Sequence, residues 1–225
     1  MTRRSNARIA GFTFLFYIAA GIASMVLFGQ ATSGEVVAEK LVAIAGHVAE
    51  VRIVVLLGLL QCFSALVLGA TLYALTREQD PDLALLGLIC RLVEGVLAAT
   101  SIPETLALLW LATASGADAP DPGAAHALGA YLLGGSMALT ATFFAVGSAL
   151  FSWLLLRGRM VPMPLAWLGV VASGLLVILL PLQLAGWLAG PITRLMWLPM
   201  LAFEVPLGLW LLIKGVAVPG KQGLH

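Results

Sequence analysis

The sequence predicts an all-α polytopic membrane protein, a bundle of six transmembrane helices with a short amphipathic outer helix between the first two. Only 10% of the 225 residues are charged, whereas a soluble domain carries about 25%. Apolar residues make up 61% of the chain and the mean hydropathy is +1.03. A water-soluble fold of this size could not bury so much apolar surface. We expect one transmembrane domain covering residues 1–225.

Six apolar stretches meet the length of about 20 residues that a helix needs to cross a bilayer. The predicted spans cover residues 8–29, 51–75, 83–113, 125–156, 164–189 and 194–214. The apolar run of the first span, Ile9 to Phe28, follows Arg3, Arg4 and Arg8 and is longer than the apolar region of a cleaved signal peptide, which has about 7–15 residues. In hydrocarbon each backbone amide must be bonded within its own segment, so these spans are predicted to be helices.

Between the first two spans lies a segment, residues 32–50, that is predicted to be helical and amphipathic. Its apolar residues Val37, Leu41, Ile44 and Val48 recur at steps of three and four, while Glu35, Glu39 and Lys40 lie elsewhere. We expect this helix to lie on the outer surface or to cap the bundle.

The distribution of cations predicts the orientation in the cytoplasmic (inner) membrane, with both termini cytoplasmic. The segments then assigned to the inside hold Arg3, Arg4, Arg8, Arg77, Arg157, Arg159, Lys214 and Lys221. Outer segments hold only Lys40 and Arg194, as the positive-inside rule requires. The tryptophans fall near predicted span ends, where amphipathic rings prefer to lie.

Several classes of partner and cofactor are excluded or disfavoured. A formal charge of +1 with no basic stripe argues against nucleic acid. Cys62 and Cys90 lie inside apolar runs, which disfavours a disulfide framework, and no metal-ligand spacing occurs. His47 and His126 could clamp a haem iron, but both lie near the outer face, so we interpret them as hydrogen-bonded bystanders and expect no cofactor.

Membrane lipids are the expected partners, and small residues indicate where helices approach one another closely. Residues 186–190 form a Gly-x-x-x-Gly motif, and residues 19–24 offer a smooth helix face. These stretches predict contact surfaces, either within one chain or between copies in a homo-oligomer.

Five charged residues lie at depths where hydrocarbon disfavours them: Arg52, Arg91, Glu94, Glu104 and Glu204. Glu204 is ten residues from both Arg194 and Lys214, which places it about 15 Å from either end of its span. Such groups normally face the bundle interior and have partners.

Arg91 and Glu94 are three residues apart, which places them on one helix face. We expect them to meet Glu204 in one interior polar core, either as a structural ion-pair network or as a site for a ligand or a proton. For Arg52 we expect a second polar pair with Glu104, and snorkelling of Arg52 to the headgroups is the alternative.

Three stretches make the chain resemble a bacterial family of six-span membrane proteins catalogued as a domain of unknown function. They are Arg8-Ile-Ala-Gly11, Arg91-Leu-Val-Glu94 and Phe203-Glu-Val-Pro-Leu-Gly-Leu-Trp-Leu-Leu-Ile-Lys-Gly215. The resemblance covers nearly the whole chain, and the last stretch is its most specific part. It implies a six-helix bundle in the cytoplasmic membrane with an outer insertion before the second helix, and it implies no established activity.

The leading functional hypothesis is a non-enzymatic bundle that binds a small or lipidic ligand, for transport or sensing, at Arg91, Glu94 and Glu204. The motivation is a charged trio at a depth where charges are disfavoured. An intramembrane enzyme acting on a lipid-like or quinone-like substrate is the alternative, with Glu204 or Glu104 as general acid/base. A structural or partner-binding subunit is the third interpretation. No catalytic sequence motif is present.

Overall fold

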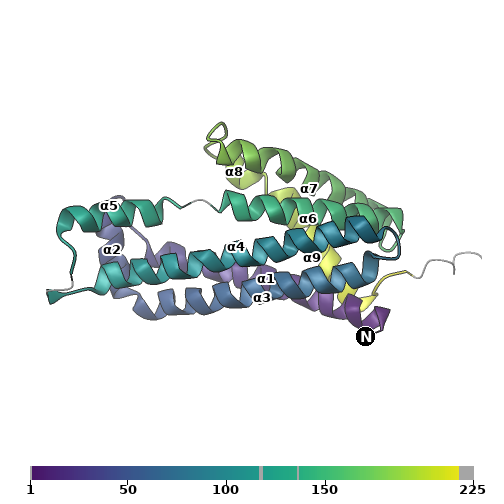
Figure 1. Cartoon of the computed structure of the whole chain (residues 1–225), viewed down its shortest axis with the longest axis horizontal. Helices are drawn as coiled ribbons and strands as arrows, with labels where there is room; N and C mark the ends of the chain where they lie inside the picture. The colour runs from purple at the N-terminus through teal and green to yellow at the C-terminus, as the bar shows by residue number, and fades with distance from the viewer. Residues whose placement is uncertain (1, 117–118, 136, 218–225) are drawn as a thin grey trace, which may run out of the picture. The chain divides into compact units, whose positions relative to one another are not determined.

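The computed structural model describes residues 2–116, 119–135 and 137–217, and within these ranges its regular structure is helical, without strands. The helices are α1 (Arg3–Ala31), α2 (Val37–Gly46), α3 (Val48–Thr76), α4 (Pro81–Thr113), α5 (Pro122–Leu133), α6 (Ala138–Arg157), α7 (Met163–Leu184), α8 (Ile192–Leu195) and α9 (Leu198–Ile213) (Figure 1). The all-α prediction is confirmed. Lys221, one of the cations assigned to the inside, lies outside the described residues.

Within the part of the chain that the structure describes, six helical segments are long and apolar enough to cross a membrane. They are α1, α3, α4, the α5–α6 segment, α7 and the α8–α9 segment. Each coincides with one predicted span, so the chain is a multi-pass membrane protein. The prediction of a helix between the first two spans is also confirmed, because α2 occupies Val37–Gly46 and buries Ile44.

The fourth predicted span differs from a single continuous helix. Gly134 and Gly135 follow the end of α5 and are not helical, and α6 begins at Ala138. Two adjacent glycines lower helix stability because glycine loses the most backbone freedom on ordering. The beginning of α5 is fixed by Asp121, whose Oδ1 accepts hydrogen bonds from the amides of Gly123 and Ala124.

The chain divides into two compact units. Unit 1 comprises Met1–Ile18, Phe63–Gly95 and Ala138–His225, and unit 2 comprises Ala19–Cys62 and Val96–Met137. Helices α1, α3 and α4 each contribute one part to unit 1 and another to unit 2. The single-domain interpretation stays a prediction.

Unit 1 has an extensive apolar core in which α6 packs on α7 and α7 packs on α9. Small residues allow the helices to approach one another closely. A Cβ added to Gly11 on α1 would lie 2.5 Å from the backbone nitrogen of Leu212 and 2.6 Å from the carbonyl oxygen of Gly208 on α9. Only hydrogen at this position allows the backbones of α1 and α9 to be so close.

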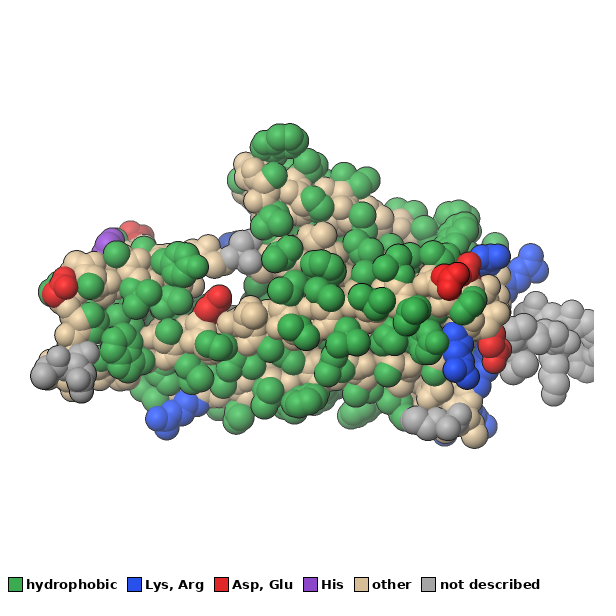
Figure 2. Space-filling view, viewed as in Figure 1, with side chains coloured by type: hydrophobic (Ala, Val, Ile, Leu, Met, Phe, Trp, Pro, Cys, Tyr) green, Lys and Arg blue, Asp and Glu red, His purple; other side chains and the backbone are tan. Residues whose placement is uncertain are grey.

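Unit 2 has a smaller core, in which α2 packs against α5. The buried residues that cluster in this core are Ala31, Ile44, Val51, Leu108 and Leu109. In both units many large apolar side chains are exposed, among them Leu56 of unit 2 and Ile178 of unit 1. Hydrophobic side chains cover much of the visible surface (Figure 2), as expected where a helix faces lipid rather than water.

Candidate functional site

Arg91 is the centre of a charged cluster buried inside unit 1. It lies on α4 and is 1% exposed. One helical turn later, Glu94 is also 1% exposed, and its Oε2 accepts a hydrogen bond of 2.9 Å from Arg91 Nη1. The i,i+3 spacing on one helix is sufficient to form this pair.

The pair is held by side chains from two other helices. Tyr17 on α1 donates its hydroxyl to Glu94 Oε1 at 2.8 Å, and Arg91 Nη2 donates to Ser148 Oγ on α6 at 3.0 Å. The guanidinium carbon also lies 4.7 Å from the centre of the Phe144 ring and 5.9 Å from that of Phe14. Hydrogen bonds and cation–π contacts therefore offset part of the cost of burying the charge.

Glu204 joins the cluster from α9, but it is held less tightly. The side chain is 8% exposed, and Oε1 lies 3.9 Å from Arg91 Nη2. Among the described residues this buried oxygen has no hydrogen-bond partner, and the same is true of Arg91 Nε. Pro206 lies two residues further along inside α9, where it removes a backbone hydrogen bond and makes the helix easier to bend.

The structure thus brings Arg91, Glu94 and Glu204 together, and we call these three residues the interior cluster. Its formal charge is −1 when all three groups are ionised, because two carboxylates face one guanidinium. Glu94 takes the short bond to Arg91, so the surplus carboxylate is Glu204. A hydrogen-bond donor or a positive charge placed beside Glu204 would complete the arrangement.

Two glycines make room for the arginine, and the sequence interpretation did not identify them. A Cβ on Gly69 of α3 would lie 2.9 Å from Arg91 Cβ, and one on Gly147 of α6 would lie 3.5 Å from Arg91 Cγ. Tyr17 and Ser148 were also missed. Polar residues within apolar spans indicate that a side chain has a polar partner inside the bundle. Nothing in the spacing of Tyr17 and Ser148, however, indicates which residue of another helix they contact.

The predicted pair of Arg52 and Glu104 in unit 2 is not formed: among the described residues neither side chain has an ion-pair partner within 4.0 Å. Both residues are exposed. Glu104 instead faces the end of α5, where its Oε2 lies 3.9 Å from the position of a Cβ on Gly135. It lines a cavity of about 430 Å³ with residues of the last turn of α5. The snorkelling of Arg52 to the headgroups stays a prediction.

The histidines and the possible metal ligands bear on whether the chain could hold a cofactor. His47 Nδ1 lies 2.8 Å from the carbonyl oxygen of Ala43, one turn earlier in the chain, a local hydrogen bond of the kind expected for a bystander. Within the part of the chain that the structure describes, no three His, Cys, Asp or Glu side chains are grouped so that they could hold a metal ion.

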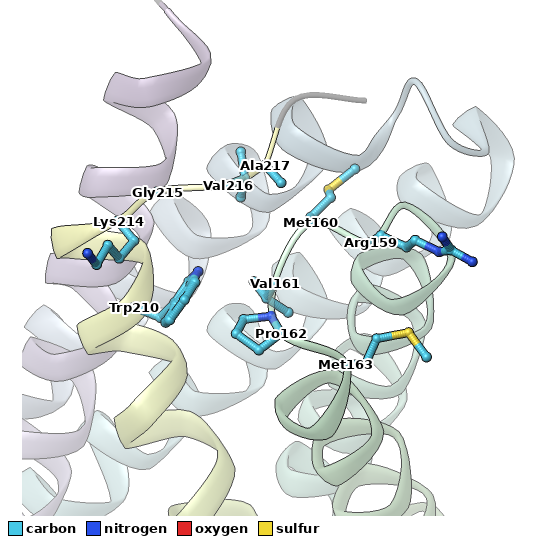
Figure 3. Close-up of a pocket in the computed structure, with 10 residues that line it drawn as sticks. All are labelled: Arg159, Met160, Val161, Pro162, Met163, Trp210, Lys214, Gly215, Val216 and Ala217. Atoms are coloured by element: carbon cyan, nitrogen blue, oxygen red, sulfur yellow. The ribbon is translucent and has the colours of Figure 1, made fainter. Parts of the chain in front are cut away.

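A second cavity, of about 490 Å³, lies at one end of unit 1 (Figure 3). The turn between α6 and α7 forms one wall, with Arg159, Val161 and Pro162, and the end of α9 forms the other, with Trp210 and Lys214. Neither this cavity nor the one beside Glu104 is lined by a residue of the interior cluster.

Comparison with known proteins places residues 9–215 within one family. The matching family model is described as "Domain of unknown function (DUF4386)". No curated protein and no solved structure matches the chain. The family match covers almost the whole chain and supplies no activity, so a functional conclusion has to come from the site itself.

Proposed function

The chain belongs to the family described as a domain of unknown function, DUF4386, and we propose that it is a membrane protein that binds a small or lipidic ligand through Glu204. The observation that carries this proposal is the buried Glu204 Oε1, which lacks a hydrogen bond among the described residues while Arg91 is engaged by Glu94. A buried carboxylate oxygen without a hydrogen bond is unfavourable, so a site for a complementary group is the natural interpretation.

The charges of the cluster define the chemistry of the ligand. Because the cluster has one carboxylate more than it has cations, the complementary head is positively charged, and a protonated amine is the simplest case. The surrounding rings and aliphatic side chains, among them Phe14 and Phe144, favour an apolar body. The ligand is therefore an amphipathic amine, which reaches Glu204 when the proline-containing α9 shifts.

Within this proposal the other two residues of the cluster have a different task. Arg91 and Glu94 are fully buried and bonded to each other, to Tyr17 and to Ser148. Such a network joins α1, α4 and α6 and holds the surroundings of Glu204 in one geometry. Arg91 and Glu94 are positioning residues, and Glu204 contacts the ligand.

The test uses dodecylamine and dodecanol, two probes with the same apolar chain and different heads. Each is added to the purified full chain in nanodiscs of zwitterionic lipid, and the melting temperature is recorded. Dodecylamine is expected to raise the melting temperature of the wild type more than dodecanol does, and Glu204→Gln is expected to remove this difference. Glu104→Gln, which alters an exposed carboxylate in unit 2, is the control and is expected to retain it.

Two results would overturn the proposal. One is an equal response of the wild type to both probes, because the positive head would then not be recognised. The other is an unchanged preference for the amine in Glu204→Gln, because the charge of Glu204 would then have no part in binding. Glu204→Asp keeps the charge and is expected to retain part of the preference, which separates loss of the site from loss of the fold.

For orientation we propose that both termini lie on the cytoplasmic side of the inner membrane. The end of unit 1 that carries Arg3, Arg157, Arg159 and Lys214 supports this, because cations accumulate on the inside. Labelling with a membrane-impermeant thiol reagent tests it. A cysteine replacing Arg159 is expected to react only after the membrane is opened. Reaction in intact cells would show that this end of the protein faces outward and would overturn the proposed orientation.

A further inference from the structure

The cavity between the α6–α7 turn and the end of α9 is held in shape by a backbone hydrogen bond. The amide of Ala217 donates to the carbonyl oxygen of Met160 at 2.9 Å, which fixes the chain after α9 against the turn. Met160 and Val161 are buried. With about 490 Å³, the cavity is within the range of small-molecule sites, about 300–1,000 Å³.

The cations of this cavity differ from two other cations of unit 1, Arg3 at the start of α1 and Arg157 at the end of α6. Arg3 pairs with Glu78 at 3.0 Å and Arg157 pairs with Asp80 at 3.2 Å. Arg159 and Lys214, by contrast, have no acidic partner within 4.0 Å among the described residues. The side chains of Arg159 and Lys214 lie on opposite flanks of the cavity and extend away from each other, so both cations are exposed at its rim (Figure 3). Two uncompensated cations at one cavity attract an anion.

The backbone at Arg159 provides a second observation. Its φ is 47°, in the left-handed region that glycine adopts freely and that arginine adopts at a cost in free energy. Unfavourable backbone conformations of this kind occur at binding sites, where the side chain is worth retaining. A tight turn alone would be satisfied by glycine at this position.

The remaining lining residues suit a lipid rather than a bare anion. Val161, Pro162 and Val216 are apolar, and the Trp210 ring lies among them with its indole nitrogen pointing toward Val216 (Figure 3). Tryptophan prefers the level of the headgroups, and basic pockets on the cytoplasmic side of membrane helices bind anionic headgroups. A phosphate with a glycerol attached matches both parts of the lining.

We propose that this cavity binds an anionic phospholipid, with the glycerol against Val161 and Val216 and the phosphate at the rim of the cavity, within reach of the long side chains of Arg159 and Lys214. The site is separate from the interior cluster and does not depend on the function proposed for Glu204. It recognises a negative head, whereas the interior cluster recognises a positive one.

Native mass spectrometry of the full chain tests the proposal, with phosphatidylglycerol and phosphatidylcholine of identical acyl chains as probes. The wild type is expected to retain phosphatidylglycerol in preference to phosphatidylcholine. The double variant Arg159→Gln/Lys214→Gln is expected to lose about tenfold or more of that preference, on the scale of two cations near an anionic surface. The double variant Arg3→Gln/Arg157→Gln removes the same number of cations, but these are paired, and it is expected to keep the preference.

Two further measurements define the ligand and the cavity. Excess inorganic phosphate is expected to leave the lipid bound, and displacement at comparable concentration would overturn the lipid assignment in favour of free phosphate. Val216→Trp, which reduces the cavity and keeps both cations, is expected to abolish the preference. Retention in Val216→Trp, or equal loss in the two double variants, would show that charge alone attracts the lipid and would overturn the site.

Discussion

Units 1 and 2 are built from parts of the same three long helices, yet they treat charge in opposite ways. Unit 1 buries Arg91, Glu94 and Glu204, whereas unit 2 buries none of its described charged residues. The apolar core differs in the same direction, since the core of unit 1 is far larger than that of unit 2. A buried charge needs partners from several helices, and among the described residues such partners are found in unit 1.

The largest expected effect comes from removing the cation at the centre of unit 1. Arg91→Met keeps most of the side-chain volume but leaves Glu94 and Glu204 buried without their positive partner. Breaking a buried ion pair in this way costs about 3–5 kcal/mol of unfolding free energy. The measurement is an unfolding titration with sodium dodecyl sulfate in mixed micelles.

Arg52→Met in unit 2 is the matched control, because Arg52 is exposed and has no acidic partner among the described residues. We expect its unfolding curve to superimpose on that of the wild type. If the two arginine variants lost similar amounts of stability, the contrast between the units would not hold.

A smaller effect is expected from adding one methyl group to α1. In unit 1, a Cβ at position 11 meets the backbone of α9 at 2.5 Å, and backbone atoms cannot rotate away as a side chain can. Gly11→Ala therefore forces α1 and α9 apart, at a cost of up to about 3 kcal/mol. The same titration measures it.

The control lies on the same helix in unit 2. A Cβ at Gly29 meets no atom within 4 Å, so Gly29→Ala adds a methyl group in open space and is expected to leave stability unchanged or slightly raised. Equal losses at positions 11 and 29 would mean that the substitution disturbs α1 itself and not its packing on α9.

The difference between the units also explains how far the sequence could predict the structure. Hydropathy located all six spans, because it depends on local composition. The pair of Arg91 and Glu94 followed from helical spacing, and the depth of Glu204 followed from its distance to flanking cations. Each of these inferences uses one helix at a time.

What could not be predicted depends on how a helix is rotated toward its neighbours. Tyr17 and Ser148 contact the cluster only because α1 and α6 present those faces to α4. The pairing of Arg52 with Glu104 was predicted from their similar depth, but depth does not specify which side of a helix a residue occupies. The glycine pair at Gly134 and Gly135 could have indicated the end of α5. Glycine is also frequent within continuous membrane helices, however, so the pair does not by itself predict a helix end.

The smallest expected effect separates the two carboxylates of the interior cluster. Glu94 accepts one hydrogen bond from Arg91 and one from Tyr17. Glu94→Gln weakens the hydrogen bond from Arg91, because the acceptor is no longer charged. It also places the amide NH2 group, a donor, opposite the Tyr17 hydroxyl that donates to Glu94. A loss of about 1.5–3 kcal/mol of unfolding free energy follows, the range for hydrogen bonds to charged groups.

Glu204→Gln removes the surplus charge, and no hydrogen bond of Glu204 Oε1 is lost. Its unfolding free energy, measured without added amine, is therefore expected to change by less than that of Glu94→Gln, because Arg91 keeps its short bond to Glu94. A Glu204→Gln variant as unstable as Glu94→Gln would mean that Glu204 holds the bundle together, which would leave no surplus carboxylate for a ligand.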